Sequence, residues 1–120
     1  GGIANPDSAS AFQEPPNPIP EPEVEAVRPW TALAKITSYC LWGLTRSETP
    51  VRDGVIATDP RVIPLGSIVD IDTLGEDFSA EDTGSAIRGW HLDVWSPSCS
   101  WSVNWGVRHR NIRVKRWGWE

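Results

Sequence analysis

Three aspartates, at positions 59, 82 and 93, lie in sequence settings that suit acid chemistry. Asp59 lies in the turn-like stretch ATDPRVIPLG, Asp82 opens the stretch DTGS, and Asp93 is the middle residue of HLDVW. A carboxyl group at a strand end or turn can donate and accept a proton when its surroundings tune its pKa. The candidate catalytic residues are therefore Asp93, Asp82 and Asp59.

Asp93 has the most informative neighbours. Side chains alternate between the two faces of a strand, so Leu92 and Val94 should share one face and His91, Asp93 and Trp95 the other. The apolar pair is expected to face the interior of the domain. An acid between an imidazole and a flat indole is what a sugar-cleaving site requires: a proton donor beside an apolar surface for a pyranose ring. The alternative is a strand-end acid paired with an arginine.

The other two aspartates have structural alternatives. Asp59 precedes a proline, and Asp82 opens a turn, and in both places an aspartate side chain commonly accepts a hydrogen bond from nearby backbone. If both lie close to Asp93, their negative charges raise its pKa and keep it protonated near neutral pH. Gly84 and Gly89 are expected to supply turn conformations that a side chain would obstruct.

The pattern of apolar residues predicts mostly short strands. They are separated by turns rich in glycine, proline and aspartate. Six short strands predict a small barrel. The expected strands are Ala34–Tyr39, Val55–Thr58, Ser67–Asp72, Phe78–Glu81, His91–Trp95 and Ile112–Lys115.

One stretch, SPSCSWSVNWG, has the signature of a short helix. Ser96 can cap its start, Pro97 suits the first helical position, and Gly106 suits its end. Trp101 and Trp105 are four residues apart, so they should share a helix face and serve mainly in packing.

The first 28 residues differ from the rest in composition. Six of the eleven prolines precede Arg28, four glutamates lie among them, and large apolar side chains are few. Such a segment cannot bury a core, and it favours an extended arm. We expect an arm or linker at residues 1–28, either an inert tether or a protein-binding segment, and one folded domain at residues 29–120.

Charge argues against nucleic acid as a partner. Residues 1–28 hold five acids and one base, which leaves eleven acids and ten bases in residues 29–120. The basic residues near the end, in NIRVKRW, alternate with apolar ones as on a solvated strand face. No recognition helix accompanies them.

No run of about twenty apolar residues is present, so no membrane span is expected. The chain has no methionine and no signal peptide, so its start at Gly1 is interpreted as a processed or trimmed end. Cys40 and Cys99 are an even pair that suits one disulfide in an oxidising compartment, and two buried thiols are the alternative. Cysteine and histidine lack metal-site spacing, so we expect no metal.

Several of these stretches, in order, resemble a known family. TSYC, TPVRDGVIATDPRVIPLGSIVDI, AEDTGSAIRG, HLDVW and WGVR resemble the 3D domain, which is named for three aspartates. That family is similar to the core of MltA-type lytic transglycosylases and to stationary-phase and resuscitation-associated muralytic proteins. The resemblance runs over essentially all of residues 35–115. It implies a mainly β fold, a six-stranded double-psi β-barrel with one short helix.

The resemblance also implies an activity. It points to a peptidoglycan lytic transglycosylase that cleaves the MurNAc–GlcNAc bond with Asp93 as the single acid and base and forms a 1,6-anhydro-muramyl product. No cofactor is implied, and the location would be secreted, periplasmic or at the cell wall. The alternative is a glycan-binding, structural or assembly module that keeps the barrel without catalysis.

Substrate-binding residues are expected around Asp93. The resemblance assigns Thr45 as a substrate-lining residue, and tryptophan is suited to stacking on sugar rings. Arg46, Glu48, Ser85 and Trp90 depart from the family pattern, which bears on substrate choice. The expected substrate-binding set is Thr45, Trp42, Gly84, Trp90, His91 and Trp95. Beyond the last strand, Trp117 and Trp119 are expected to be exposed, as a surface for a protein partner.

The string DTGS also resembles the active-site motif of aspartic proteases. In those enzymes an apolar pair precedes the aspartate, whereas Ala80 and Glu81 precede Asp82 here. A half-size protease would have to dimerise, and HLDVW would remain unexplained. The glycan-cleaving interpretation is therefore preferred.

Overall fold

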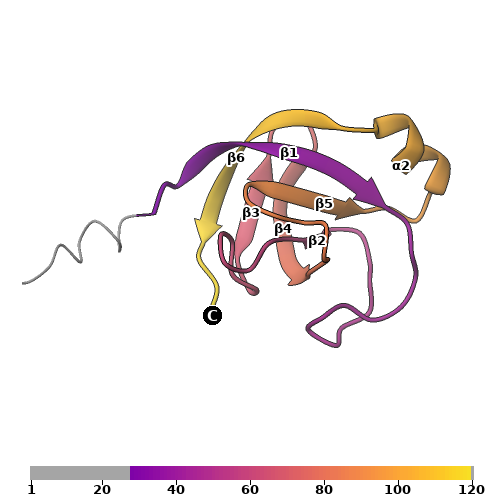
Figure 1. The fold of residues 1–120 in the computed structure, drawn as a ribbon, viewed down its shortest axis with the longest axis horizontal. Coiled ribbons are helices and arrows are strands. Elements are labelled where there is room, and N and C mark those ends of the chain that lie inside the picture. The colour runs from indigo at the N-terminus through magenta and orange to yellow at the C-terminus, as the bar shows by residue number, and fades with distance from the viewer. Residues whose placement is uncertain (1–27, 120) are drawn as a thin grey trace, which may run out of the picture.

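The computed structural model describes residues 28–119, which form a closed barrel of six strands with one short helix, α2 (Figure 1). The mainly β six-stranded barrel expected from the sequence is confirmed. The expected arm lies outside the described residues except for Arg28, so the division of the chain at residue 28 stays a prediction. The elements are β1 (Thr31–Tyr39), β2 (Val55–Ala57), β3 (Ile68–Ile71), β4 (Gly75–Asp82), β5 (His91–Trp95), α2 (Cys99–Trp105) and β6 (Arg108–Arg116).

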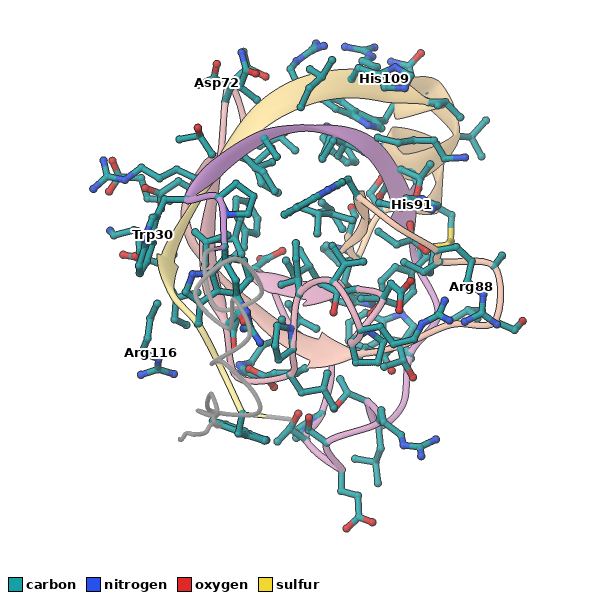
Figure 2. The ribbon with its side chains drawn as sticks, turned by 60° about the vertical axis from the view of Figure 1, so that its left-hand side comes forward. Trp30, Asp72, Arg88, His91, His109 and Arg116 are labelled. Atoms are coloured by element: carbon teal, nitrogen blue, oxygen red, sulfur yellow. A yellow bond between two sulfur atoms is a disulfide. The ribbon has the colours of Figure 1, made fainter. Side chains whose placement is uncertain are left out.

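The strands follow the order β1-β5-β2-β4-β3-β6 around the barrel, and β6 closes on β1. β1 pairs with β5 and β2 with β4 in parallel, while the other four pairings are antiparallel. β1 and β6 run side by side across the molecule in Figure 1. Figure 2 shows the ring of strands, with Trp30 and Arg116 on one side and Arg88 and His91 on the other. Closure leaves no edge strand exposed to a neighbouring chain.

Alternating apolar residues fill the barrel. Within β1, Ala34 and Ile36 are buried between neighbours that are exposed or half-buried, and in β6 Ile112 and Val114 are buried between exposed neighbours. Each isoleucine, leucine or valine buried in this way stabilises the fold by about 1.5–3 kcal/mol. The predicted solvated face of the last strand is confirmed. The buried core residues are Ala34, Ile36, Ile56, Ile63, Val69, Ile71, Ala80, Leu92, Val94, Trp105, Ile112 and Val114.

A second, smaller core lies on the outside of the barrel wall. Trp95, Val51 and Val55 are buried together, and Tyr39 packs against them. The segment between β1 and β2, residues 40–54, supplies Val51 to this cluster, and we call it the 40–54 loop. Leu92 and Val94 belong to the main core, as the strand alternation predicted. Because the second core lies on their opposite side, the residues of β5 are buried on both faces.

Helix α2 begins two residues later than the sequence predicted. Ser98 is its N-cap, since its side chain accepts a hydrogen bond from the backbone N–H of Trp101, and Gly106 ends it with a φ of 64°. The expectation that Ser96 caps the helix is wrong. Its hydroxyl instead accepts from the Ser98 backbone N–H at 3.1 Å, in the turn before the helix. The rings of Trp101 and Trp105 stack with centroids 5.4 Å apart, as their spacing predicted.

The last tryptophans differ in exposure. Trp119 is 65% exposed, as expected, and its ring lies over Gly66, where a Cβ atom would overlap it. Trp117 is half-buried against the barrel core, and its ring packs edge-to-face with that of Trp30, with the ring centroids 6.0 Å apart. The expected exposure therefore holds for Trp119 and not for Trp117, and a protein-partner surface at this end stays a prediction.

A disulfide ties the helix to the barrel. Cys40 directly follows β1, Cys99 is the first residue of α2, and the two are bonded, so of the two alternatives for these cysteines the structure has the disulfide. Two further contacts hold α2 on β1. Ser38 and Ser102 share a hydroxyl hydrogen bond of 2.7 Å, and the Trp105 indole N–H donates to the carbonyl of Ile36 at 3.0 Å.

Reduction of this disulfide is expected to lower the free energy of unfolding by about 2–5 kcal/mol, because a bridge between residues 59 positions apart restricts the unfolded chain. Denaturant titration with and without dithiothreitol measures the difference. A Cys40→Ala/Cys99→Ala variant should match the reduced protein and respond no further to reductant. An unchanged midpoint on reduction would contradict the expectation.

Candidate active site

Four neighbouring strands bring two of the three aspartates to the same level of the barrel wall. Thr37 of β1 pairs with Asp93 of β5, Asp93 pairs with Ala57 of β2, and Ala57 pairs with Asp82 of β4. Asp93 and Asp82 are thus two strands apart, roughly 10 Å between backbones at ordinary strand spacing. The pairing of β2 with β4 shifts register between Ile56 and Ala57, and this shift places Asp82 opposite Ala57.

A hydroxyl and an imidazole hold Asp93. The Thr37 hydroxyl donates to Asp93 Oδ1 at 2.8 Å, and the Thr37 hydroxyl oxygen also lies 2.8 Å from His91 Nε2. The Thr37 hydroxyl has one hydrogen, which it donates to Asp93. It must therefore accept the hydrogen bond from His91, whose Nε2–H is the donor. Burial lowers the pKa of His91, and the positive charge of Lys35 adds to this. A neutral imidazole therefore positions Thr37, which positions Asp93.

Asp93 holds its proton more tightly than an ordinary aspartate. Its pKa is raised chiefly by burial, against the Thr37 hydrogen bond, which lowers it, and the negative charge of Asp82 raises it further. The side chain is half-buried, so it is shielded from water but not closed off. Such a carboxyl is suited to donating a proton and taking one back.

Asp82 is fixed by three hydrogen bonds. Its Oδ2 accepts from the Tyr39 hydroxyl at 3.0 Å, and its Oδ1 accepts from the backbone N–H groups of Arg46 and Thr83, each at 2.9 Å. Burial and then the charge of Asp82 raise the pKa of Tyr39, so the phenol stays protonated and keeps donating. Asp82 thus fixes two loops while its charge acts on Asp93.

Asp59 is a buried loop anchor. Only 1% of it is exposed, and its two oxygens accept from the Arg61 guanidinium, each at 3.1 Å. It also accepts from the backbone N–H of Arg61, the predicted turn bond, and from that of Gly89 at 2.8 Å. The Arg61 guanidinium holds the pKa of Asp59 far below its usual range. The expectation that Asp59 raises the pKa of Asp93 is wrong, because only Asp82 among the aspartates contributes.

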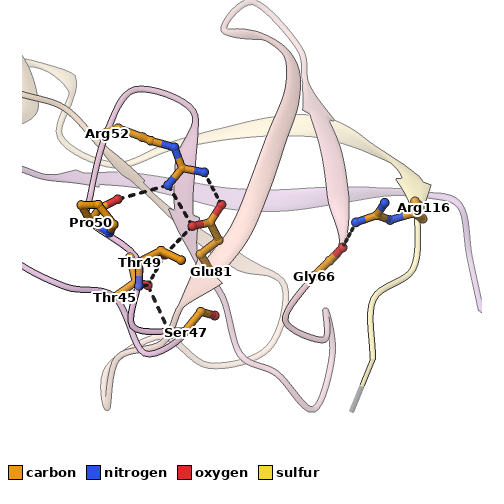
Figure 3. Close-up of polar contacts among 8 residues, drawn as sticks. All are labelled: Thr45, Ser47, Thr49, Pro50, Arg52, Gly66, Glu81 and Arg116. Carbon is orange, nitrogen blue, oxygen red and sulfur yellow. Dashed lines mark hydrogen bonds and ion pairs between the residues drawn. The ribbon is translucent and has the colours of Figure 1, made fainter.

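Glu81 is a structural support next to Asp82 that sequence reasoning missed. Figure 3 shows its carboxylate between Arg52 and Thr49, with Arg52 donating to both oxygens at 2.9 and 2.7 Å. Arg52 lowers the pKa of Glu81 to about 2. Ser47 adds a backbone bond to the Glu81 carbonyl. These contacts fasten the 40–54 loop to β4 immediately before Asp82.

Thr37 and Tyr39 were also missed. Both belong to TSYC and lie two residues apart, so the alternation that placed His91 and Asp93 on one face predicts one face for them as well. That signal was present in the sequence. What it could not reveal is which neighbouring strand they face.

Most of the expected substrate-binding set is buried. Trp95 is 4% exposed and donates its indole N–H to the Leu41 carbonyl, His91 is 7% exposed, and Trp90 packs against the barrel core. Trp95 and His91 are therefore closed off by their neighbours, which gives them packing and positioning roles in place of a groove. Trp90 is only partly buried, so its place in a groove stays a prediction. Thr45 is 5% exposed, and its hydroxyl bonds to Thr49 at 2.7 Å, which makes it a brace within the 40–54 loop.

Two members of the set lie at the surface. Trp42 is 72% exposed and rests on the edge of Trp95 with ring centroids 4.9 Å apart, so its outer face is open to a ligand. Gly84 lines a surface hollow of about 360 Å³ beside Asp82. Gly89 has a φ of 71°, the turn conformation expected there. At Gly84 the constraint is space, because an added Cβ atom would lie 3.0 Å from the Ile87 side chain.

The described residues hold no group of three or more histidine, cysteine, aspartate or glutamate side chains arranged for a metal ion. Within residues 28–119, no helix has the length and apolar character needed to cross a membrane.

Two substitutions should move the pKa of Asp93 in opposite directions. Thr37→Val removes the hydrogen bond to the carboxylate and should raise it, whereas Asp82→Asn removes a negative charge and should lower it. Carboxyl chemical shifts followed by NMR against pH measure both. Shifts of the same sign would contradict this arrangement of groups.

Arg52→Gln should weaken the fold in a pH-dependent way. The pKa of Glu81 is depressed, so the stabilisation from Arg52 is complete above the ordinary value of 4.5 and is lost as pH falls through about 2. Because Arg52 is more than half exposed, we expect a loss of about 1 kcal/mol at pH 7. Urea titrations of both proteins at pH 7 and at pH 2 to 3 check this, and a difference that grows on acidification would overturn it.

Comparison with known proteins identifies the chain's relatives. The family model of the 3D domain matches residues 54–116, which is more than half of the chain. The cell wall-binding protein YocH of Bacillus subtilis (strain 168) is 52% identical over 60 residues, covering 50% of this chain and 21% of YocH. A second protein of that strain, YabE, is 47% identical over 60 residues, covering 50% of this chain and 14% of YabE. The chain thus spans a minor part of these relatives.

Solved structures agree on the fold. The structure of E. coli MltA with bound chitohexaose is similar with a TM-score of 0.52 and 20% sequence identity, covering 62% of this chain and 28% of MltA. The barrel is therefore the MltA-like one that the sequence motifs implied. The family match, which covers more than half of the chain, shows that the chain belongs to the 3D domain family.

Proposed function

We propose that this domain is a peptidoglycan lytic transglycosylase, with Asp93 as its proton donor and acceptor. The observation that carries the proposal is the half-buried Asp93 carboxyl, whose pKa is raised and whose orientation is fixed by Thr37. Two other carboxyl groups in the described residues, Asp59 and Glu81, have lowered pKa values and arginine partners, which Asp93 lacks.

One such acid is sufficient for this reaction. Ordinary glycosidases need two carboxyl groups, one to protonate the leaving oxygen and one to act as nucleophile or to activate water. In a transglycosylase the 6-hydroxyl of the muramyl residue attacks its own anomeric carbon, so the nucleophile is already bound. Asp93 first protonates the glycosidic oxygen. Its carboxylate then accepts the proton of the attacking hydroxyl, which restores the acid.

Asp82 and Asp59 support this acid in different ways. The charge of Asp82 helps to keep Asp93 protonated, and Asp59 fixes the backbone next to Gly89 without acting on Asp93. The exposed ring of Trp42 offers an apolar surface for a sugar at the rim of the second core. Of the expected binding residues, we propose that the exposed Trp42 and the hollow-lining Gly84 touch the glycan.

The relatives support a cell-wall substrate. YocH is named a cell wall-binding protein, and the segment it shares with this chain is half of the chain. We therefore place the proposed activity at the cell wall, with glycan strands as the partner and with no cofactor. The same name favours a second candidate function, a wall-binding module without catalysis.

Asp93→Asn should separate the two candidates. We expect the purified domain to release 1,6-anhydromuropeptides from sacculi and the variant to lose at least about 100-fold in rate, because general acid–base catalysis contributes on the order of 10²- to 10⁴-fold. Mass spectrometry of the digest identifies the products. Asp72→Asn, on a distant turn, is the matched control, and circular dichroism checks that the barrel is intact.

Release of reducing ends in place of anhydro products would contradict the transglycosylase. So would equal turnover by the variant. If neither protein releases product but both sediment with sacculi to the same extent, the wall-binding module is the function.

A further inference from the structure

We propose that the hollow beside Asp82 binds a carboxylate of the peptide that peptidoglycan strands carry. The inference rests on the proposed function, since it extends the same site from the sugar to the peptide attached to it. The hollow has a volume of about 360 Å³ and is lined by Arg46, Pro60, Leu65, Thr83, Gly84, Ser85 and Arg88.

The hollow lies directly beside Asp82. Asp82 Oδ1 accepts from the backbone N–H groups of Arg46 and Thr83, and both of these residues line the hollow. A glycan placed with its scissile bond at Asp93 would therefore have the hollow on the Asp82 side. A peptide attached to the muramyl sugar is the ligand group nearest to it.

The hollow is cationic. Arg46 and Arg88 are its charged lining residues, and no acidic side chain lines it. Within residues 28–119 neither guanidinium makes a hydrogen bond or ion pair with another side chain, unlike Arg61, which is held by Asp59. Arginine stays charged at every relevant pH, and its planar guanidinium matches a carboxylate with two parallel hydrogen bonds.

The other two aspartates fix the backbone at or beside these arginines. Asp82 fixes the backbone N–H of Arg46, and Asp59 fixes that of Gly89, next to Arg88. The side chains of both arginines are exposed, so they can adjust to a ligand while their backbones stay fixed. Asp59 and Asp82 can therefore contribute to ligand binding without contacting the scissile bond.

The other hollows suit anions less well. The hollow of about 800 Å³ between β1, β3 and β6 is lined by Asp70, Asp72 and Glu76 with a single arginine. The hollow of about 690 Å³ near Trp101 is lined by acids and by no base. Among these hollows, the one beside Asp82, with its two unpaired arginines, is the best suited to a carboxylate.

The test measures binding in an Asp93→Asn background, so that cleavage does not remove the ligand. The probes are soluble glycan strands with their peptides and the same strands after an amidase has removed the peptides. We expect the Asp93→Asn protein to bind the peptide-bearing strands at least about 10-fold more tightly, the effect of one charge-assisted contact. Adding Arg46→Gln and Arg88→Gln should bring the two affinities together. Arg113→Gln, which removes the same charge on β6, should leave the preference intact.

Each outcome has a distinct meaning. Equal binding of both strands by the Asp93→Asn protein, or a preference that survives the double arginine change, overturns the carboxylate site and leaves the proposed cleavage standing. No binding of either strand would count against the proposed function itself. A phosphodiester polymer of the wall is the other possible source of an anion. If this polymer displaces bound peptide-free strands, and the protein shows no preference for peptide-bearing strands, the hollow binds phosphate in place of carboxylate. The Arg46→Gln backbone still donates to Asp82, and thermal unfolding confirms that the barrel is kept.

Discussion

The candidate site depends on one irregularity in the pairing of β2 with β4. Val55 and Ile56 lie opposite Ser79 and Ala80, and a regular ladder would then place Glu81 opposite Ala57. The register shift places Asp82 there instead. Irregular pairings of this kind re-aim side chains, and here the change brings Asp82 level with Asp93. Glu81 is left to bind Arg52 and fasten the 40–54 loop.

Similar side chains acquire different properties from their surroundings. Asp59 is held by a guanidinium and is a permanent carboxylate, Asp82 is bound by a phenol and two amides, and Asp93 has a single hydroxyl partner in a half-buried setting. The donors that reach Asp59 lower its pKa, whereas burial outweighs the single hydroxyl donor of Asp93 and raises its pKa. Only the one with the fewest donors among the three is suited to acid catalysis.

Sequence reasoning succeeded where the information is local. Alternation in HLDVW correctly placed Leu92 and Val94 inside the barrel, and the glycine after α2 ended the helix as expected. It failed where a distant segment intervenes. The second face of β5 is covered by the 40–54 loop, so Trp95 is buried instead of lining a groove, and no local pattern reports that cover. The pairing of Asp59 with Arg61 was equally accessible from sequence spacing but was not anticipated.

The contact between Thr37 and Asp93 joins residues 56 positions apart, across the parallel pairing of β1 with β5. Contacts of such separation carry a large loop-closure cost and form slowly. Until β5 docks against β1, position 93 is an ordinary, solvated aspartate with an ordinary acidity. The raised pKa of Asp93 therefore depends on the docking of β5 against β1, so the acid acquires its catalytic property only when these two distant strands have paired.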